Sequence, residues 1–144
     1  MQEPKKYFYK DGTLRTVDSH MQGESILYWP NGKIKRKCHF VKGVRHGLDE
    51  MWSEEGLLVD EGRYDLGKPI GFHRRYSKTG SLIEEVEYLD EGRFNLREWD
   101  DEGVLRVEVI WSEMSYREKA WDRFQNIWIE KKGFWDGKKL VYIS

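Results

Sequence analysis

Residues 52–71 read WSEEGLLVDEGRYDLGKPIG, and the skeleton of this stretch recurs along the whole chain. An aromatic residue, Trp52, is followed by Gly56, by Leu58 and by a second aromatic residue, Tyr64. A recurring pattern with a period of roughly 20–50 residues is typical of repeat proteins. The chain is therefore predicted to consist of five to six copies of one small unit. The other copies begin near Phe8, Tyr28, Tyr76, Trp99 and, in degenerate form, Trp121.

Each unit has the pattern of a β-hairpin. In residues 33–40, KIKRKCHF, the residues Ile34, Cys38 and Phe40 fall on one face of a strand, because strand side chains alternate between faces. A glycine precedes this strand, where a short hairpin loop needs a positive φ angle that glycine adopts without a Cβ clash. These glycines are Gly12, Gly32, Gly56, Gly80 and Gly103. The opposite, polar face carries Lys33, Lys35, Lys37 and His39.

The repeat predicts an all-β fold: an elongated antiparallel β-meander of five to six hairpin repeats of about 23 residues each. One domain is expected over residues 1–144, with a closing strand over residues 138–144. For residues 112–128 two interpretations stay open, a degenerate repeat or a helix that a capping box from Ser115 to Glu118 would start. The first aromatic residues are expected to stack as a row in the core, namely Tyr28, Trp52, Tyr76 and Trp99.

The net charge of -1 conceals an uneven distribution of charge. Residues 1–48 carry 10 Lys and Arg against 4 Asp and Glu, residues 49–113 carry 8 against 18, and residues 114–144 carry 7 against 4. In a linear array this places an acidic middle between two basic ends. A nucleic-acid binder is usually basic overall, so we expect no nucleic-acid partner. The single cysteine and the lack of a long apolar run favour a cytoplasmic location.

No residue pattern indicates catalysis, a cofactor or a metal. Glu85 and Glu87 lie on the polar face of a predicted strand, where nothing encloses a substrate between paired carboxylates. Cys38 lies on the apolar face and is expected to be a packed thiol. The stretch GKPIG at residues 67–71 lacks the spacing of a phosphate-binding loop. We therefore predict that the chain is not an enzyme and binds no cofactor and no metal.

The links between hairpins, such as GVRHG at residues 43–47 and GKPIG, vary in length and chemistry. They are expected to line one edge of the meander, where variable loops on a rigid scaffold usually serve recognition. Three tryptophans, Trp29, Trp128 and Trp135, fall outside the repeat pattern and are candidates for a cap or a binding hot spot. The predicted partner-binding residues are Arg45, His46, Lys68, Ile70, Arg93 and Asn95. Candidate contacts for lipid or another anion are Lys33, Lys35 and Lys37.

The residues Tyr28, Asn31, Gly32 and Ile34, followed by the spacing of GKPIG, resemble the MORN repeat and more closely the bacterial MORN-variant repeat. The resemblance implies a cytoplasmic, non-catalytic module that binds another protein, in many members as an antitoxin that blocks a toxin. The alternative it implies is a peripheral protein that binds phospholipid, here with weak membrane contact. Enzymatic activity ranks last. A single-layer sheet also leaves a homodimer as one way to cover its apolar face.

Overall fold

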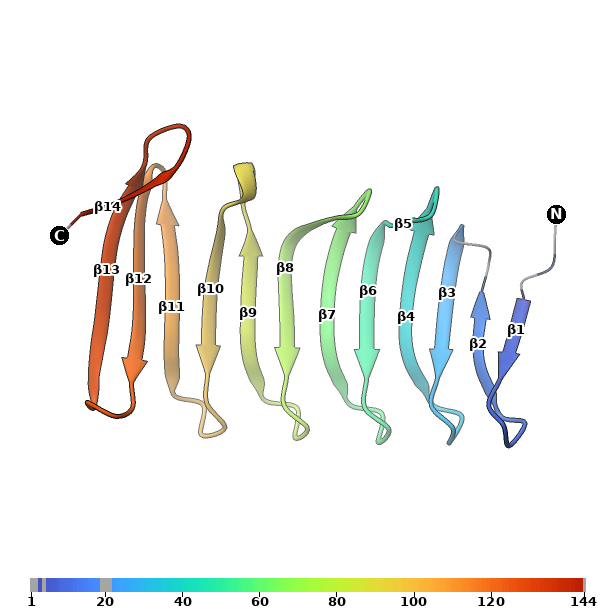
Figure 1. Cartoon of the computed structure of the whole chain (residues 1–144). Coiled ribbons are helices and arrows are strands. Elements are labelled where there is room, and N and C mark those ends of the chain that lie inside the picture. Colours follow the sequence, from blue (N-terminus) through green and yellow to red (C-terminus); the bar gives the residue numbers. More distant parts are fainter. Residues whose placement is uncertain (1–2, 4, 19–21, 144) are drawn as a thin grey trace.

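The computed structural model describes residues 3, 5–18 and 22–143, which form one open antiparallel sheet (Figure 1). Apart from the short β5, which pairs only with β4, the strands lie side by side in sequence order. The predicted all-β meander is thus confirmed, with 14 strands in the described residues. The elements are β1 (Lys5–Phe8), β2 (Leu14–Asp18), β3 (Gly23–Tyr28), β4 (Ile34–Val41), β5 (Val44–Arg45), β6 (Gly47–Trp52), β7 (Leu58–Asp65), β8 (Lys68–Tyr76), β9 (Leu82–Tyr88), the 3-10 turn η1 (Asp90–Gly92), β10 (Phe94–Trp99), β11 (Leu105–Ser112), β12 (Ser115–Asp122), β13 (Ile127–Trp135) and β14 (Leu140–Ile143).

The repeat motif closes the hairpins along the lower edge of the sheet in Figure 1. The first aromatic residue of each repeat ends its strand and lies opposite the leucine or isoleucine that follows the glycine by two positions. In the third copy, Trp52 pairs with Leu58. The register shifts by one residue beside each such pair, which increases the local twist. The other pairs are Phe8 with Leu14, Tyr28 with Ile34, Tyr76 with Leu82, and Trp99 with Leu105.

The loops between these paired residues share one geometry. In the third copy, the Ser53 N–H donates to the Leu57 carbonyl at 2.8 Å, and the Gly56 N–H donates to the Ser53 carbonyl at 3.0 Å. Gly56 has φ of 95°, in the left-handed region that a Cβ disfavours. The same two bonds recur in the other four loops, whose glycines are Gly12 (φ 86°), Gly32 (85°), Gly80 (87°) and Gly103 (78°).

Two-residue turns join β4 to β5, β7 to β8 and β11 to β12 at the upper edge of the sheet, where η1 lies between β9 and β10 (Figure 1). Between β4 and β5, Lys42 and Gly43 both have positive φ, at 50° and 79°, as a type I′ turn requires. Leu66 and Gly67 repeat this geometry between β7 and β8, with φ of 43° and 87°. Type I′ turns match the twist of the strands that they join, so each link returns the chain directly into the sheet.

Residues 112–128 belong to a degenerate hairpin and not to a helix. They run from β11 through β12 into β13, and Trp121 lies opposite Trp128. At the turn Asn126 takes the positive φ of 56°, one residue after Gln125, which stands where the other repeats have glycine. The Asp122 carboxylate accepts the N–H groups of residues 124 and 125 at 2.8 and 3.0 Å. A side-chain cap and an asparagine thus replace the glycine loop.

The two faces of the sheet, which we name A and B, differ in composition. Paired residues on antiparallel strands share a face, and successive residues alternate between faces. Face A carries the second aromatic residue of each repeat, including Tyr64, Tyr88 and Trp111. Face B carries charged side chains of neighbouring strands, such as Arg74 opposite Glu85.

The expected stacking of the first aromatic residues is wrong. Tyr28, Trp52, Tyr76 and Trp99 each lie two strands from the next, because β4, β7 and β9 run between them. Strands are about 4.8 Å apart, so these rings are separated by about 10 Å, beyond the range of ring contact. Rings meet on face A instead, where the imidazole of His73 lies 5.0 Å from the Tyr64 ring and 4.8 Å from the Tyr88 ring, between centroids. His20, which the repeat pattern places in this second row, lies outside the described residues.

A single layer buries little. Among the described residues, only three apolar side chains are buried, namely Cys38, Val109 and Tyr116. The accessible surface is 10215 Å², whereas a compact monomer of 17.3 kDa would expose about 7,800 Å². The fold therefore depends on contacts between adjacent strands more than on a closed core.

The substitution Gly62→Ala is predicted to destabilise the sheet. A Cβ at this position would lie 2.2 Å from the His73 Nδ1 atom. The imidazole cannot move freely, because two tyrosine rings flank it and its Nε2 atom lies 2.7 Å from the Arg63 carbonyl oxygen. We expect a loss of about 1–3 kcal/mol in the free energy of unfolding, measured by denaturant titration.

The double variant Gly62→Ala, His73→Ala serves as the control. Removing the imidazole relieves the clash, so the two substitutions should cost clearly less together than the sum of their separate effects. An additive double variant would show that His73 is not the obstacle.

Candidate functional site

The N-terminal half of face A holds a polar cluster around the buried carboxylate of Asp49. Arg36 binds it through two nitrogens, at 2.9 and 2.6 Å, and Arg45 binds it at 3.1 Å. The hydrogen bond to Asp49 raises the pKa of the Arg36 guanidinium above its usual value, so the guanidinium stays protonated beside the carboxylate. Arg45 also donates to the hydroxyl of Tyr64 at 3.1 Å and lies 4.4 Å from the centre of its ring. This cluster links β4, β5, β6 and β7.

Cys38 lies beside this cluster and is buried at 6% exposure, the packed thiol that its alternation predicts. Burial raises the pKa of the thiol above its usual value, and the charge of Asp49 acts in the same direction. A thiol with a raised pKa is a poor nucleophile near neutral pH. Cys38 therefore acts as a small packing residue.

The C-terminal half of face A is apolar and contains a hollow of about 430 Å³. Its wall comes from β10, β11, β12 and the end of the chain. The Trp111 ring lies 5.0 Å from that of Tyr116 and 6.2 Å from that of Trp135, so three aromatic side chains form a continuous patch. Aliphatic residues complete the wall: Leu96, Val107, Val109 and Leu140.

The C-terminal hairpin shapes this hollow. β14 crosses the upper end of β12 and β13 (Figure 1). A Cβ on Gly133 would lie 2.5 Å from the Val141 carbonyl oxygen, so a glycine is needed for β14 to approach this closely. The N–H of Trp135 donates to the Met114 carbonyl at 2.7 Å, and Tyr142 lies with its ring 5.9 Å from that of Tyr116. These contacts place the Trp135 indole in the wall.

Two polar features mark the same wall. The Tyr116 hydroxyl donates to the carboxylate of Glu118, and burial together with this bond raises the pKa of the tyrosine above its usual value. The indole N–H of Trp135 is buried and has no hydrogen-bond acceptor among the described residues. A buried donor without a partner is uncommon in a folded protein.

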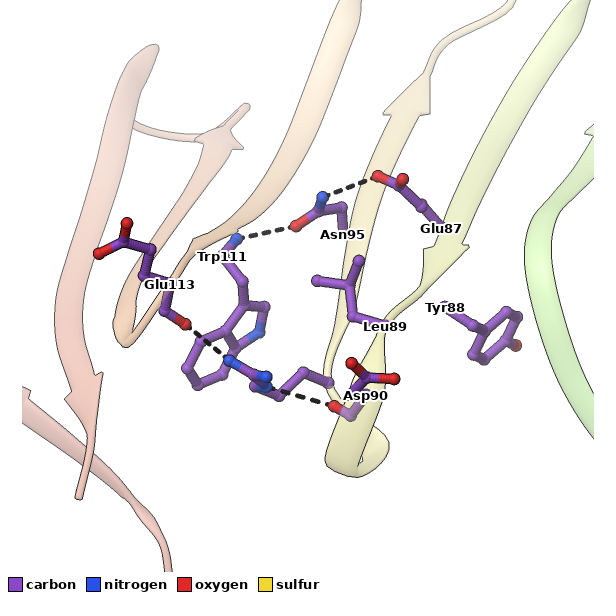
Figure 2. Close-up of a pocket in the computed structure, with 8 residues that line it drawn as sticks. Glu87, Tyr88, Leu89, Asp90, Asn95, Trp111 and Glu113 are labelled. Atoms are coloured by element: carbon purple, nitrogen blue, oxygen red, sulfur yellow. Dashed lines mark hydrogen bonds between the residues drawn. The ribbon is translucent and has the colours of Figure 1, made fainter. Parts of the chain in front are cut away.

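A second hollow, of about 510 Å³, opens at the upper edge between η1 and the turn that joins β11 to β12 (Figure 2). Here β10 and β11 have separated, and the side chain of Asn95 bridges them. It donates to the Glu87 carboxylate at 2.9 Å and accepts the backbone N–H of Trp111 at 2.8 Å. Arg93 donates to the carbonyl oxygens of Asp90 and Glu113, at 3.2 and 2.6 Å, and so ties the two turns together.

Face B is covered by a ladder of ion pairs. Arg74 lies 3.8 Å from Glu61 and 2.8 Å from Glu85, and Arg97 continues from Glu85 at 3.9 Å to Glu108 at 3.1 Å. Each exposed pair contributes little alone, but the series runs without a break across five strands from β7 to β11. Acidic and basic side chains therefore occupy the middle of this face and form ion pairs with one another.

The six predicted partner-binding residues all lie toward the upper edge, but most of them serve the fold. Arg45, Asn95 and Arg93 bind neighbouring strands and turns as described above. His46 accepts the N–H of residue 66 at 3.3 Å through Nδ1. Arg45, predicted to bind a partner, is thus also held within the chain by Asp49 and Tyr64. The exposed members of the set are Lys68 and Ile70.

The three lysines proposed for lipid or anion contact also have partners within the chain. Lys33 donates to the Glu55 carbonyl at 2.8 Å, Lys35 lies 4.3 Å from the centre of the Trp29 ring, and Lys37 lies 3.2 Å from the Glu24 carboxylate. Lys33 lies at a loop of the lower edge, whereas Lys35 and Lys37 lie on face B. They do not form one flat basic surface.

The sequence interpretation missed the Asp49 cluster and the apolar hollow. Arg36 shares a face with Cys38 by strict alternation, and a charged residue on the apolar face was the available signal for a buried partner. Trp135 was singled out because it falls outside the repeat pattern, and it does line the hollow. No sequence signal indicated that β14 would cross the neighbouring strands and complete the wall.

Arg45→Ala is predicted to lower the stability of the chain, because it removes one of two guanidinium groups from the buried Asp49 carboxylate. We expect a loss of about 1–2 kcal/mol, since the guanidinium is partly exposed and water screens the lost interaction. Lys68→Ala, at an exposed position of the same edge, should change the free energy of unfolding by less than about 0.5 kcal/mol. Thermal melting of both variants measures this difference, and equal melting temperatures would contradict it.

Comparison with known proteins supports the hairpin repeat. The family model of the MORN repeat variant matches residues 21–42, which include β3, β4 and the loop around Gly32. No curated protein matches the sequence at a significant level. No helix in the described part of the chain has the length and apolar character of a membrane span. The matched hairpin is thus similar to the MORN repeat variant, and its loop bonds and aromatic pair recur along the sheet.

Proposed function

We propose that this chain is a protein-binding repeat module whose partner docks on the C-terminal half of face A. The observation that carries the proposal is the hollow lined by Trp111, Tyr116 and Trp135, on a sheet that no second layer of described residues covers. Large aromatic side chains grouped in one patch are typical of interface hot spots. A partner that covered this patch would supply the second layer that the sheet lacks.

The exposed area supports a macromolecular partner. The chain exposes 10215 Å², which exceeds the value for a compact monomer of its mass by about 2,400 Å². A standard protein interface buries about 1,600 Å² in total, with half of this area on each side. The surplus is therefore large enough for a partner of ordinary size. A small ligand would cover only a fraction of it.

The rigidity of the patch also favours binding. Val109 and Tyr116, which are 7% and 8% exposed, form a fixed floor. Arg93 holds the two turns above the hollow through its bonds to Asp90 and Glu113, and its guanidinium lies 5.7 Å from the centre of the Trp111 ring. Because these side chains are ordered before a partner arrives, docking loses little conformational entropy.

Face B is a less suitable docking surface. Its ion pairs already satisfy one another, and a partner would have to remove water from them without offering better contacts. Membrane binding has no comparable support, since the lysines at residues 33, 35 and 37 have partners within the chain and the middle of the sequence is acidic. Lys68 and Ile70 remain candidates for peripheral contacts with a protein partner.

An antitoxin role is one form of the proposed function, and it rests on the resemblance noted in the sequence. Such a protein blocks a toxin by covering its surface, which requires docking and no chemistry on the antitoxin. The proposed site meets this requirement because it is open and apolar. Identification of the captured protein decides between a toxin and another partner.

Phe94→Ala is predicted to weaken partner binding. The Phe94 side chain lines the hollow and is 40% exposed, so it can reach a docked protein. Truncation of an aromatic contact of this kind typically costs about 1–3 kcal/mol of binding free energy, or roughly fivefold to 150-fold in affinity. The measurement is quantitative capture of proteins from a lysate of the source cell on the immobilised chain, followed by titration of the captured protein.

Phe72→Ala is the matched control, because Phe72 is a phenylalanine of similar exposure, 44%, on face B. Both variants should melt at similar temperatures, and only the variant at residue 94 should lose its partner. Loss of the partner with Phe72→Ala alone would place the docking surface on face B. Equal capture by both variants would exclude the hollow as the main contact.

A further inference from the structure

The last long strand of the sheet has an open edge. β13 pairs with β12 over residues 127–134, but β14 covers its other edge only from Lys132 to Trp135. In the described part of the chain, no strand pairs with the outer edge of residues 127–131, and Figure 1 shows the lower part of β13 at the margin of the sheet. Along these five residues, every other residue therefore presents its backbone N–H and C=O groups to the open edge.

The side chains of this stretch are unusual for an open edge. Ile127, Trp128 and Ile129 follow one another and are 48%, 42% and 43% exposed. Proteins usually protect such edges with charge, proline or a bulge, because an apolar edge pairs readily with another strand. At the opposite end of the sheet, β1 has Lys5 and Lys6 in its four residues. The edge of β13 lacks this protection over its first three residues.

We propose that the edge of residues 127–131 accepts an extended segment of another protein as an additional antiparallel strand. Addition of a strand uses backbone hydrogen bonds for affinity and alternate side chains for specificity. An incoming segment would place side chains opposite Ile127 and Ile129 on face A and opposite Trp128 on face B. β-Branched residues fit these positions best, because they pack well across strands.

A second copy of the chain fits this edge poorly. In each copy, β14 already pairs with the edge of β13 beyond Lys131, and β13 itself begins at Ile127, after the hairpin loop. Only residues 127–131 are therefore open for pairing between two copies. The register that pairs all five residues would therefore set Ile129 against its own counterpart. Trp128 would then face Glu130, and Ile127 would face Lys131, so apolar side chains would oppose charged ones. Pairing with β1 of another copy would add two lysines to an edge that already carries Lys131.

The charges at the upper end of the edge define the segment further. The side chains of Lys131 and Lys132 are 58% and 59% exposed. Lys131 reaches Glu118 only at 4.0 Å, so it remains available for a closer carboxylate. An opposite charge directly across an antiparallel pair is favourable, and a like charge is not. The segment should therefore carry an acidic residue opposite Lys131, followed by alternating β-branched residues.

This site is separate from the hollow on face A. None of residues 127–131 lines that hollow, which uses β13 only at Trp135. Strand addition and docking on face A can therefore be tested independently. A negative result for one of these two proposals does not contradict the other.

The test uses the full chain and a synthetic peptide, acetyl-Ser-Glu-Thr-Val-Thr-Val-Ser-amide. Its glutamate is designed to lie opposite Lys131 in the antiparallel register. Amide chemical shifts and hydrogen exchange are followed as peptide is added. We expect shifts concentrated in residues 127–131 and slower exchange of the outward-facing amides there. Shifts confined to β1 or to the residues that line the hollow on face A would overturn the proposal, as would the absence of shifts at millimolar peptide.

A charge exchange fixes the register. Lys131→Glu should lower the affinity for the glutamate peptide about three- to tenfold. It should raise the affinity for a peptide with lysine in place of that glutamate by a similar factor. Lys132→Glu is the control, because β14 already pairs with this residue, and it should affect both peptides less. Equal affinities in all combinations would contradict the antiparallel register. Sedimentation without peptide must show a monomer, since a dimer with protected residues 127–131 would overturn the choice of partner.

Discussion

A single antiparallel layer has solvent on both faces, and this constraint governs the rest of the structure. In the described residues no second sheet or helix covers the side chains, so stability must come from contacts along each face and from backbone pairing between neighbours. The sheet meets the constraint differently on its two faces. Face B carries charged side chains that satisfy one another in the series from Glu61 to Glu108. Face A packs rings and aliphatic groups, and in its C-terminal half it leaves them open.

The same constraint explains the uneven division of face A. In the N-terminal half, Arg36 and Arg45 neutralise the Asp49 carboxylate and fill the space that a second layer would occupy. In the C-terminal half, the chain turns back on itself through β14. The aromatic patch there lines a hollow and is bordered by Leu140 of this strand. Fold and proposed function therefore share one cause, because the residues that a compact protein would bury are those that remain available to a partner.

Much of this architecture could be predicted from the sequence, because its determinants are local. The spacing from Trp52 to Gly56 and Leu58 defines one hairpin, and five hairpins in succession define the meander. The site was harder to predict, since it depends on contacts between residues far apart in the sequence. Arg45 was predicted only as a partner-binding residue, yet its guanidinium contacts Tyr64, 19 residues away. The position of β14 depends on the close approach of Gly133 to Val141, which no local pattern encodes.

The common geometry of the lower loops has a consequence for the history of the chain. Each hairpin contacts only its neighbours and returns the backbone to the same edge in the same direction. Unequal recombination could therefore insert or delete a whole repeat in frame, and the sheet would lengthen or shorten without disturbing distant contacts. The proposed binding surface at the C-terminal end would be preserved while the scaffold changed in length. Gene duplication can thus adjust the reach of such a protein independently of its specificity.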